Sequence, residues 1–187
     1  PIYHFLLSIT GALIYRFPAK SIKVIGVTGT KGKSSTTEIL NTILEQSGKK
    51  TAVANTIRYK IGDKEWRNMF KMTMRGRFFT QSFLRKAVDA GVEYAILEVS
   101  SESVKQFRHK FLELDALIFT NLSPEHIESH GSYENYVNAK VDIAKELQKT
   151  SKKNPVIVVN TDDKEAQKFL DLNIKNKIKY SINDAFN

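Results

Sequence analysis

Residues 26–35, with the sequence GVTGTKGKSS, have the composition of a loop that holds phosphate groups. The loop follows an apolar, β-branched run and comes directly before a helical pattern. Glycines let backbone N–H groups turn toward phosphate oxygens, and the N-terminus of the next helix adds partial positive charge. We therefore expect Lys33 to contact the terminal phosphates and the Ser34 hydroxyl to bind magnesium. The alternative is a tight strand-to-helix turn with chance glycines, which the strand–loop–helix context disfavours.

The loop departs from the strict Walker spacing, which would place its first glycine at Val27 instead of Gly26. The pattern T-G-T-x-G-K-S-S that remains from Thr28 is more specific than the generic one. It predicts the phosphates of a nucleotide as the ligand and Mg²⁺ as the cofactor. The expected phosphate-binding residues of the loop are Gly29, Thr30, Lys31, Gly32, Lys33, Ser34 and Ser35.

Two further polar residues follow apolar runs that read as strands. Glu98 ends such a run, where a carboxylate is costly unless something binds it. Metal ligation is the expected role, and an exposed strand end is the alternative. His126 lies in a polar loop after another run, and its neutral imidazole can join an oxygen-rich magnesium site or contact phosphate. A structural hydrogen bond within the loop is the alternative for His126.

Lys140 falls inside the apolar stripe of a predicted helix. A lysine on such a face either extends its amine to solvent or has a function. The apolar stripe consists of Tyr133, Tyr136, Val137, Val141, Ala144 and Leu147.

The elements that must position these residues alternate between β-rich runs and helical patterns, which predicts an α/β fold with a mostly parallel sheet flanked by helices. The expected strands cover residues 23–28, 51–54, 94–99, 116–120, 156–160 and 178–181. The expected helices cover residues 34–46, 78–90, 133–149 and 163–171. Residues 57–68, with Gly62-Asp63 between alternating residues, read as a small inserted hairpin. Such sheets bind ligands at the carboxyl ends of their strands.

Composition narrows the function classes. A chain of 187 residues with 41% hydrophobic content can bury one substantial core. The sequence has no cysteine, which excludes a disulfide scaffold and cysteine-ligated metal and suits the cytoplasm. The net charge of +9 favours acidic partners. Because no basic helix, zinc finger or aromatic–basic RNA motif occurs, we expect no nucleic acid partner. The positive charge is then explained by binding of phosphorylated small molecules or by a solvated basic surface.

The apolar stretch at residues 5–17 is too short and too interrupted to span a bilayer. It also lacks the basic leader and the cleavage site of a signal peptide. We expect no stable membrane insertion, and interpret residues 1–20 as a helical stub that packs on the domain of residues 21–187 or belongs to a missing neighbour. The start at Pro1 without methionine suggests an excerpt of a longer protein.

The sequence resembles the Mur ligase family, whose loop reads T-G-T-N-G-K-[ST]-[ST], with Lys31 in place of the usual Asn. Other segments match that family in the expected order, from about residue 24 to about residue 163. They are E-V-S-S from Glu98, T-N-L-S-P-E-H from Thr120, H-G from His130 with Tyr136 and Ala139-Lys140 after it, and N-T-D-D from Asn160.

The resemblance implies a P-loop NTPase-like central domain of an ATP-dependent amide ligase in peptidoglycan precursor synthesis. E-V-S-S is similar to members that add the third residue to a UDP-N-acetylmuramoyl-dipeptide, so ATP and a UDP-muropeptide are the implied partners. The phosphate-binding residues of the loop are then the implied ATP-binding residues. ATP phosphorylates a carboxylate, and an amine attacks the acyl phosphate. The implied catalytic residues are Lys33, His126 and Lys140. The implied metal-binding residues are Ser34, Glu98, His126 and a carbamylated Lys140.

The resemblance also implies adenine contact by Asn160, together with Asp163 at the nucleotide. An Asx turn ahead of the next helix is the alternative for Asn160, and both roles are compatible.

The acceptor side departs from the family pattern. Of the usual T-T-P-like turn, only Thr73 is present in M-T-M-R, and the histidine that commonly follows E-V-S-S is Glu102. Gln106 and Arg108 match the family's Q-x-R. The implied substrate-binding residues are Thr73, Ser100, Gln106 and Arg108. We expect the family's N-terminal UDP-binding domain and C-terminal closing domain to lie outside this chain, which alone should not catalyse ligation.

Two other functions stay open. A folylpolyglutamate-type ligase shares the fold, but its phosphate loop and the segment at the strand-end glutamate usually differ from those here. A non-catalytic nucleotide-binding module is the second alternative. The joint presence of Lys33, Glu98, His126 and Lys140 argues against such a module, because mere binding does not need a two-metal site.

Overall fold

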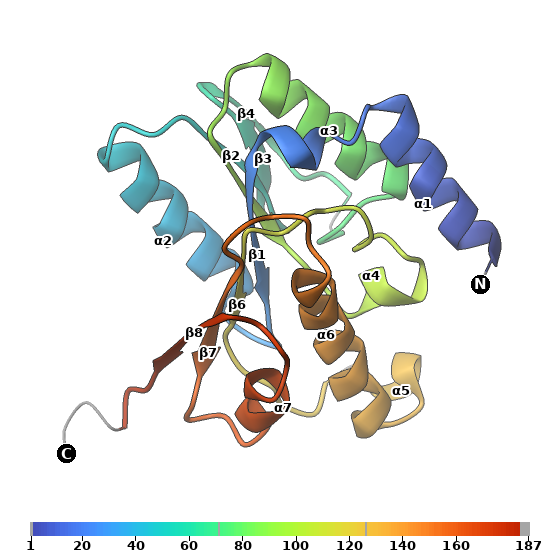
Figure 1. The fold of residues 1–187 in the computed structure, drawn as a ribbon, viewed down its shortest axis with the longest axis vertical. Coiled ribbons are helices and arrows are strands. Elements are labelled where there is room, and N and C mark those ends of the chain that lie inside the picture. The colour runs from blue at the N-terminus through green and yellow to red at the C-terminus, as the bar shows by residue number, and fades with distance from the viewer. Residues whose placement is uncertain (1, 71, 126, 184–187) are drawn as a thin grey trace.

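The computed structural model describes residues 2–70, 72–125 and 127–183, which form a mixed eight-stranded sheet with helices on both faces (Figure 1). The strands are β1 (Lys23–Thr28), β2 (Thr51–Ala54), β3 (Arg58–Ile61), β4 (Lys64–Arg67), β5 (Tyr94–Glu98), β6 (Ala116–Phe119), β7 (Val156–Asn160) and β8 (Asn176–Tyr180). The helices are α1 (Ile2–Ile14), the 3-10 helix η1 (Pro18–Ser21), α2 (Lys33–Gln46), α3 (Arg77–Asp89), α4 (Glu102–Lys105), α5 (Ile127–His130), α6 (Tyr133–Gln148) and α7 (Ala166–Leu170).

The strand order is β4-β3-β2-β5-β1-β6-β7-β8. The strands from β2 to β8 in that order run parallel, and the hairpin β3–β4 adds two antiparallel strands at one edge. The predicted α/β class and the inserted hairpin are thereby confirmed. Because β1, β5, β6 and β7 are parallel, their carboxyl ends meet at one edge of the sheet.

Side chains alternate between the two faces of the sheet, and each face buries its own core. Val27, Val53 and Ile96 pack under α2 on one face. On the other face, β-strand residues such as Leu97 and Leu117 pack with α3, α6 and α7. This double coverage explains why the parallel strands read as nearly continuous apolar runs in the sequence.

The C-terminal elements differ from the expected ranges. The last strand begins at Asn176, two residues before the expected start, and the last helix is only α7 instead of residues 163–171. Asp163 lies outside that helix. Its side chain instead accepts two backbone hydrogen bonds, from the Glu165 N–H to Oδ1 (2.9 Å) and from the Leu122 N–H to Oδ2 (2.6 Å). The short helices α4 and α5 were not expected, because four residues are too few for a periodic pattern.

Helix α1 packs on the domain, as expected for the apolar N-terminal stretch. The Ser8 hydroxyl donates to the Phe107 carbonyl (2.9 Å), and Gly11 lies against Phe78 of α3. Within residues 2–70, 72–125 and 127–183, no helix has the length and apolar character needed to cross a bilayer.

Candidate functional site

The loop between β1 and α2 is held against the loop that follows β6. Gly29 has φ +150°, and a Cβ there would lie 1.9 Å from Thr120 Oγ1, so only glycine permits this approach. The Thr30 N–H donates to the Asn121 carbonyl (2.8 Å). Gly32 also needs a positive φ (+79°), but a Cβ at this position would have no atom within 4 Å. The loop is therefore packed on one side and open at Gly32, as a phosphate cradle must be.

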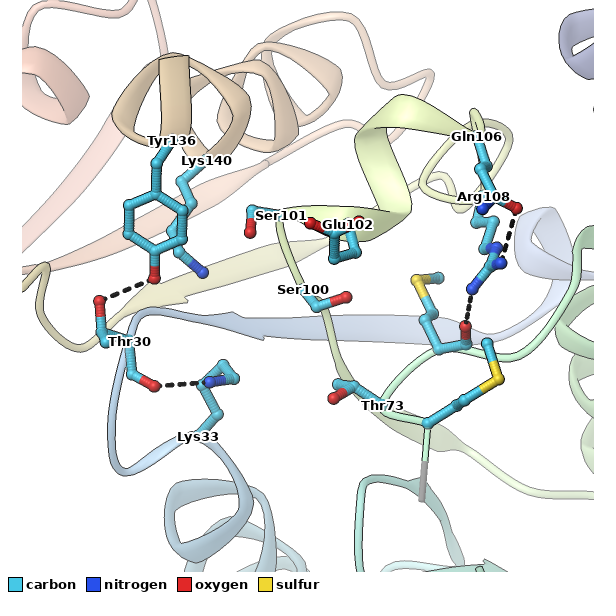
Figure 2. A pocket seen from close by; sticks show the side chains of 12 residues that line it. Thr30, Lys33, Thr73, Ser100, Ser101, Glu102, Gln106, Arg108, Tyr136 and Lys140 are labelled. Carbon is cyan, nitrogen blue, oxygen red and sulfur yellow. Dashed lines mark hydrogen bonds between the residues drawn. The ribbon is translucent and has the colours of Figure 1, made fainter. Parts of the chain in front are cut away.

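Lys33, the first residue of α2, lies at the mouth of this loop. Its Nζ donates to the Thr30 carbonyl (2.8 Å), as Figure 2 shows, and lies 3.9 Å from Glu98 Oε1. Burial lowers the pKa of Lys33, and the charge of Glu98 opposes that shift. Lys31 and Ser35 lie on the outer side of the loop, and Lys31 Nζ lies 3.6 Å from the Glu125 carboxylate. Of the predicted loop residues, Thr30 and Lys33 thus line the cavity, while Lys31 and Ser35 face outward.

Glu98 is buried at the end of β5, with 3% of its surface exposed, so the exposed-strand-end alternative is wrong. Its Oε2 accepts hydrogen bonds from the Ser34 hydroxyl (2.8 Å), the Thr56 N–H (2.9 Å) and the Thr56 hydroxyl (3.1 Å). The Thr56 hydroxyl is also 3.0 Å from the Thr73 hydroxyl. Sequence analysis missed Thr56, although it follows the carboxyl end of β2, where ligand-contacting residues are expected.

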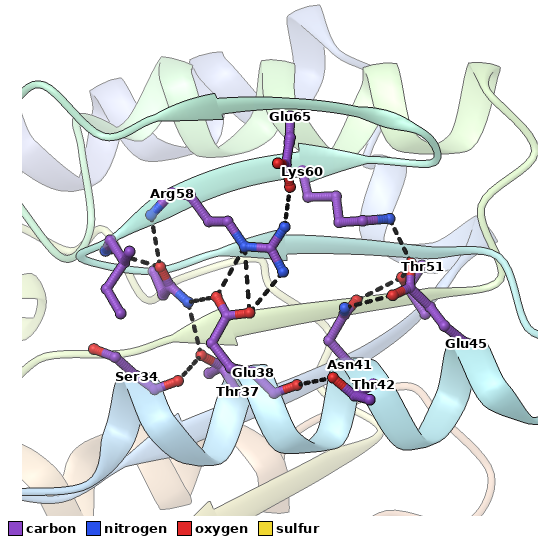
Figure 3. A network of polar contacts seen from close by, with 12 residues as sticks. Ser34, Thr37, Glu38, Asn41, Thr42, Glu45, Thr51, Arg58, Lys60 and Glu65 are labelled. Carbon is purple, nitrogen blue, oxygen red and sulfur yellow. Dashed lines mark hydrogen bonds and ion pairs between the residues drawn. The ribbon is translucent and has the colours of Figure 1, made fainter.

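A polar network joins α2 to the hairpin (Figure 3). The network includes Asn55, the residue before Thr56. The Glu38 carboxylate accepts from Arg58 Nη2 (2.6 Å) and Asn55 Nδ2 (2.7 Å). Asn55 Oδ1 accepts from the N–H groups of Ile57 and Arg58 (2.8 Å each). The hydrogen bond and charge of Arg58 hold the pKa of Glu38 below its usual range. The turn that carries Thr56 is therefore fixed on both sides.

The described residues fit a magnesium ion that substrate phosphates help to hold. Ser34 Oγ and the Glu98 carboxylate are hard oxygen donors 2.8 Å apart. Magnesium usually takes one or two carboxylates, phosphate oxygens and water instead of a closed protein cage. In the part of the chain that the structure describes, no three His, Asp or Glu side chains gather as a metal cage. His126, a predicted ligand, lies outside the described residues.

Lys140 is buried in α6, with 1% of its surface exposed, so its amine does not reach solvent and the snorkelling alternative is wrong. Its Nζ donates to the Gly29 carbonyl (2.7 Å) and lies 5.1 Å from the centre of the Tyr136 ring. Burial lowers the pKa of Lys140 to about 7, and the positive charge of Lys33 acts in the same direction. A substantial neutral fraction of the amine therefore exists near neutral pH.

A cavity of about 350 Å³ joins the phosphate loop to the segments expected to bind the acceptor (Figure 2). Lys33 and Lys140 line its nucleotide side, and Arg108 lies across from them in Figure 2. The Arg108 guanidinium donates to the Met74 carbonyl and to Gln106 Oε1, both at 2.6 Å. All four predicted substrate-binding residues line this cavity: Thr73, Ser100, Gln106 and Arg108.

The residues that depart from the family pattern lie in the same cavity. Met72 and Met74 line it on either side of Thr73. Glu102 also lines it, and its Oε1 accepts from the Ser129 hydroxyl (2.6 Å) and lies 3.1 Å from His130 Nε2. The departures therefore change the surface that an acceptor meets, while the phosphate loop keeps its geometry.

Asn160 and Asp163 hold the strand-end loops together. Asn160 Nδ2 donates to the Thr120 carbonyl (2.8 Å), and Asn160 Oδ1 accepts from the Asp162 N–H (3.0 Å), which is the Asx turn of the alternative interpretation. Asp163 bonds the loop after β6 through Leu122. Adenine contact by either residue stays a prediction.

Tyr136 lines the site, although the sequence placed it only on the apolar stripe of the helix and in the family-like segment after His130, without a role at the site. Its hydroxyl lies 2.8 Å from Thr30 Oγ1, and its ring lines the cavity next to Lys140. The signal was its position one helical turn before Lys140 on the same stripe.

Comparison with known proteins identifies the family. Residues 27–187 match the family model of the Mur ligase middle domain. The chain belongs to this family. A UDP-N-acetylmuramoyl-L-alanyl-D-glutamate--2,6-diaminopimelate ligase of Clostridium botulinum is 35% identical over 176 residues, which cover 94% of this chain and 35% of that protein. This Mur ligase middle domain thus spans about a third of the length of the curated relatives it matches.

Solved structures share the fold. A UDP-N-acetylmuramoyl-L-alanyl-D-glutamate--2,6-diaminopimelate ligase aligns with a TM-score of 0.75 and 24% identity, over 92% of this chain and 35% of that one. A Mycobacterium tuberculosis folylpolyglutamate synthase, solved with ADP and AMPPCP, aligns with a TM-score of 0.69 and 11% identity, over 94% and 46% of the two chains. At these identities the likeness supports the Mur ligase middle domain architecture alone.

Removing the Thr56 hydroxyl should weaken magnesium-dependent nucleotide binding. Thr56→Val takes away one donor to the Glu98 carboxylate, and hydrogen bonds to charged groups contribute about 1.5–3 kcal/mol. We expect calorimetric titration with magnesium and a non-hydrolysable ATP analogue to give at least about tenfold weaker binding. Thr56→Ser keeps the hydroxyl, and Thr42→Val removes an exposed hydroxyl of α2 that bonds only the Glu38 carbonyl; both should bind as the wild type does. Equal affinity of Thr56→Val and wild type would contradict the role of Thr56.

Lys140 should make stability depend on pH. Its pKa is about 7 in the folded chain against 10.5 for the free side chain, so the unfolded chain binds more protons between these values. The free energy of unfolding therefore rises with pH there, on the order of 2 kcal/mol from pH 7 to pH 9. Urea unfolding in degassed buffer should lose this rise in Lys140→Met, and a rise that persists in the variant would assign it to another group.

Proposed function

We propose that this chain is the ATP-binding central domain of an ATP-dependent amide ligase that acts on a UDP-N-acetylmuramoyl-peptide. One observation carries the proposal: a single cavity is lined by Lys33 and Lys140 of the nucleotide side and by Thr73, Ser100 and Arg108 of the expected acceptor side. Membership of the Mur ligase middle domain family and the names of the curated relatives support the same substrate class.

The proposed reaction has two steps. A carboxylate oxygen of the muropeptide attacks the γ-phosphorus of ATP, the bond to ADP breaks, and an acyl phosphate forms. The nitrogen of an incoming amino acid then attacks the acyl carbon, phosphate leaves, and the nitrogen loses a proton. Both steps build negative charge on phosphate oxygens, so fixed cations beside the loop stabilise the transition state more than the ground state.

Each residue of the cavity has a role in this proposal. Lys33 leaves the Thr30 carbonyl and pairs with the terminal phosphates, while the amides around Gly32 hold their oxygens. Ser34 and Glu98 hold magnesium, which when bound neutralises charge on the phosphates. Arg108 faces the acceptor as an anion-binding group. Its guanidinium is already aligned by the Met74 carbonyl and Gln106.

We further propose that Lys140 carries carbon dioxide as a carbamate in the assembled enzyme. The neutral amine attacks carbon dioxide, a nitrogen–carbon bond forms, and one proton is released. The lowered pKa of Lys140 supports this step, because only the neutral amine reacts. The product is an anionic oxygen donor of the kind that magnesium prefers. When the carbamate forms, the Lys140 amine gives up the hydrogen bond that it now donates to the Gly29 carbonyl.

A folylpolyglutamate-type ligase is the second candidate, and the shared fold is the observation in its favour. The curated relatives and the E-V-S-S segment at the end of β5 favour the muropeptide as substrate. A regulatory module without catalysis is the third candidate. The buried Lys140 near Lys33 and Glu98 argues against this candidate, because nucleotide binding alone needs no buried amine.

The proposal extends to the rest of the protein. In this proposal, residues 21–187 are the central domain and residues 1–20 are a helical segment attached to it. A UDP-binding domain and a closing domain then account for the additional length of the relatives. Residues 1–187 alone then bind magnesium–ATP weakly and form no amide bond. Because the proposed reaction consumes ATP, we propose that it takes place in the cytoplasm.

The function is tested on the complete gene product. It is assayed for phosphate release with UDP-N-acetylmuramoyl-dipeptide or with dihydrofolate, each with a panel of amino acids. We expect turnover only with the muropeptide, and a loss of at least about a hundredfold in Lys33→Ala or Glu98→Ala, because each removes a charged group from the transition state. Lys175→Ala, which removes an exposed lysine outside the loop, should keep most activity. Faster turnover with the folate would replace the proposal by the second candidate.

The carbamate is tested by chemical rescue. Lys140→Ala should be nearly inactive, and added formate or acetate should restore part of the activity by filling the vacated position with a carboxylate. The same anions should leave Lys33→Ala inactive, because that variant lacks a cation. Full activity of Lys140→Ala would rule out the carbamate, and inactivity that no carboxylate relieves would assign Lys140 a packing role.

A further inference from the structure

Helix α1 is turned with its small side chains inward and its large apolar side chains outward. Ser8, Gly11 and Ala12 are its buried residues. The outward residues are between 55% and 75% exposed, and they are Ile2, Tyr3, Leu6, Leu13 and Ile14. A helix that packs on a water-facing domain normally buries its large apolar stripe, so this orientation is the reverse of the common pattern. Five large apolar side chains exposed on one short helix indicate a binding surface.

The orientation of α1 is fixed by specific contacts. The Ser8 hydroxyl donates to the Phe107 carbonyl, and the Phe5 ring packs against the rings of Phe107 and Phe111. Gly11 lies against Phe78 of α3. Figure 1 shows α1 on the outer side of α3, at the periphery of the molecule. The apolar side is therefore held outward on a rigid support.

The charges that border α1 have one dominant sign. The helix itself contains no Asp, Glu, Lys or Arg, and the first acidic residue of the chain is Glu38. Arg16 and Lys20 are exposed directly after the helix. Arg85 of α3 lines the same surface hollow as Ile14 and Arg16, but it pairs with Asp89 (3.0 Å), so Arg16 and Lys20 carry the positive charge at this end. The exposed apolar side of α1, with cations at one end, is therefore complementary to a surface with an apolar interior and anionic groups on its outside.

The dimensions of α1 distinguish between possible occupants. A helix of 13 residues is about 20 Å long and about 10 Å wide, so one face offers about 200 Å². A stable protein interface needs about 800 Å² from each partner, which disfavours a second copy docked through this helix alone. The helix is also too short to span a bilayer, but an in-plane helix needs only to bury one face between lipid headgroups and acyl chains.

We propose that α1 docks this domain on an anionic membrane surface, lying in the plane of the interface. Ile2, Leu6, Leu13 and Ile14 enter the acyl boundary, and Arg16 and Lys20 contact anionic headgroups. Tyr3 lies at headgroup level, where aromatic side chains are favoured. The cavity beside Lys33 and Lys140 is not part of this surface, so docking is independent of the proposed ligase reaction.

The test is vesicle flotation of the complete gene product, because a domain outside residues 1–187 could cover the helix. Vesicles contain phosphatidylcholine alone or an equal mixture with phosphatidylglycerol. We expect the protein to float with the anionic vesicles, to float much less with the neutral ones, and to be released by high salt. The double variant Leu6→Glu/Leu13→Glu should lower the bound fraction at least about tenfold, because it places carboxylates on the inserted face.

The matched control is Ile39→Glu/Ile43→Glu, which changes two equally exposed apolar residues of α2 and should float as the wild type does. Circular dichroism checks that both variants stay folded. Failure of the wild type to float, equal flotation with both kinds of vesicle, or equal loss in the two variants would overturn the proposal. A concentration-dependent dimer that only Leu6→Glu/Leu13→Glu abolishes, without flotation, would replace the membrane by a second copy of the chain.

Discussion

The close approach of Gly29 to Thr120 is the constraint on which the site depends. Any side chain at position 29 would overlap the Thr120 hydroxyl, so the phosphate loop and the loop after β6 fit together only around a glycine. Lys140 then donates to the Gly29 carbonyl from α6, and Asn160 donates to the Thr120 carbonyl from the end of β7. Three parallel strands and one helix therefore meet around Gly29 and Thr120.

Glu98 illustrates how a buried carboxylate can be stable before any metal is present. Burial of a lone carboxylate is costly, and hydrogen bonds from Ser34 and Thr56 to one oxygen offset that cost. The second oxygen faces Lys33 at 3.9 Å, which is beyond hydrogen-bond distance. The same Thr56 hydroxyl reaches Thr73 in the wall of the cavity, so the nucleotide side and the acceptor side share one chain of hydroxyl groups.

The two lysines of the cavity have different electrostatic positions. Lys33 keeps a nearby carboxylate and can pair with phosphate when the substrate enters. The Lys140 amine donates to the Gly29 carbonyl and lies near the Tyr136 ring, and its pKa falls to about 7 mainly because burial removes it from water, with the charge of Lys33 acting in the same direction. Burial lowers the pKa of both lysines, but the charge of Glu98 opposes the shift at Lys33, so Lys33 is the better suited of the two to act as a cation and Lys140 to react as a neutral amine.

The sequence by itself determined the strand–loop–helix order, the phosphate loop and the residues at the strand ends, because glycine spacing and apolar periodicity are local properties of the chain. It also placed Lys140 on a helical stripe. Only the tertiary structure decided that Lys140 is fully buried, that Thr56 bonds Glu98, and that Asp163 bonds a loop 41 residues earlier instead of starting a helix. The orientation of α1 could not be predicted from the sequence either, because the apolar run is the same whichever side of the helix faces the domain. These features depend on contacts between segments far apart in the chain, and local patterns carry no information on such contacts.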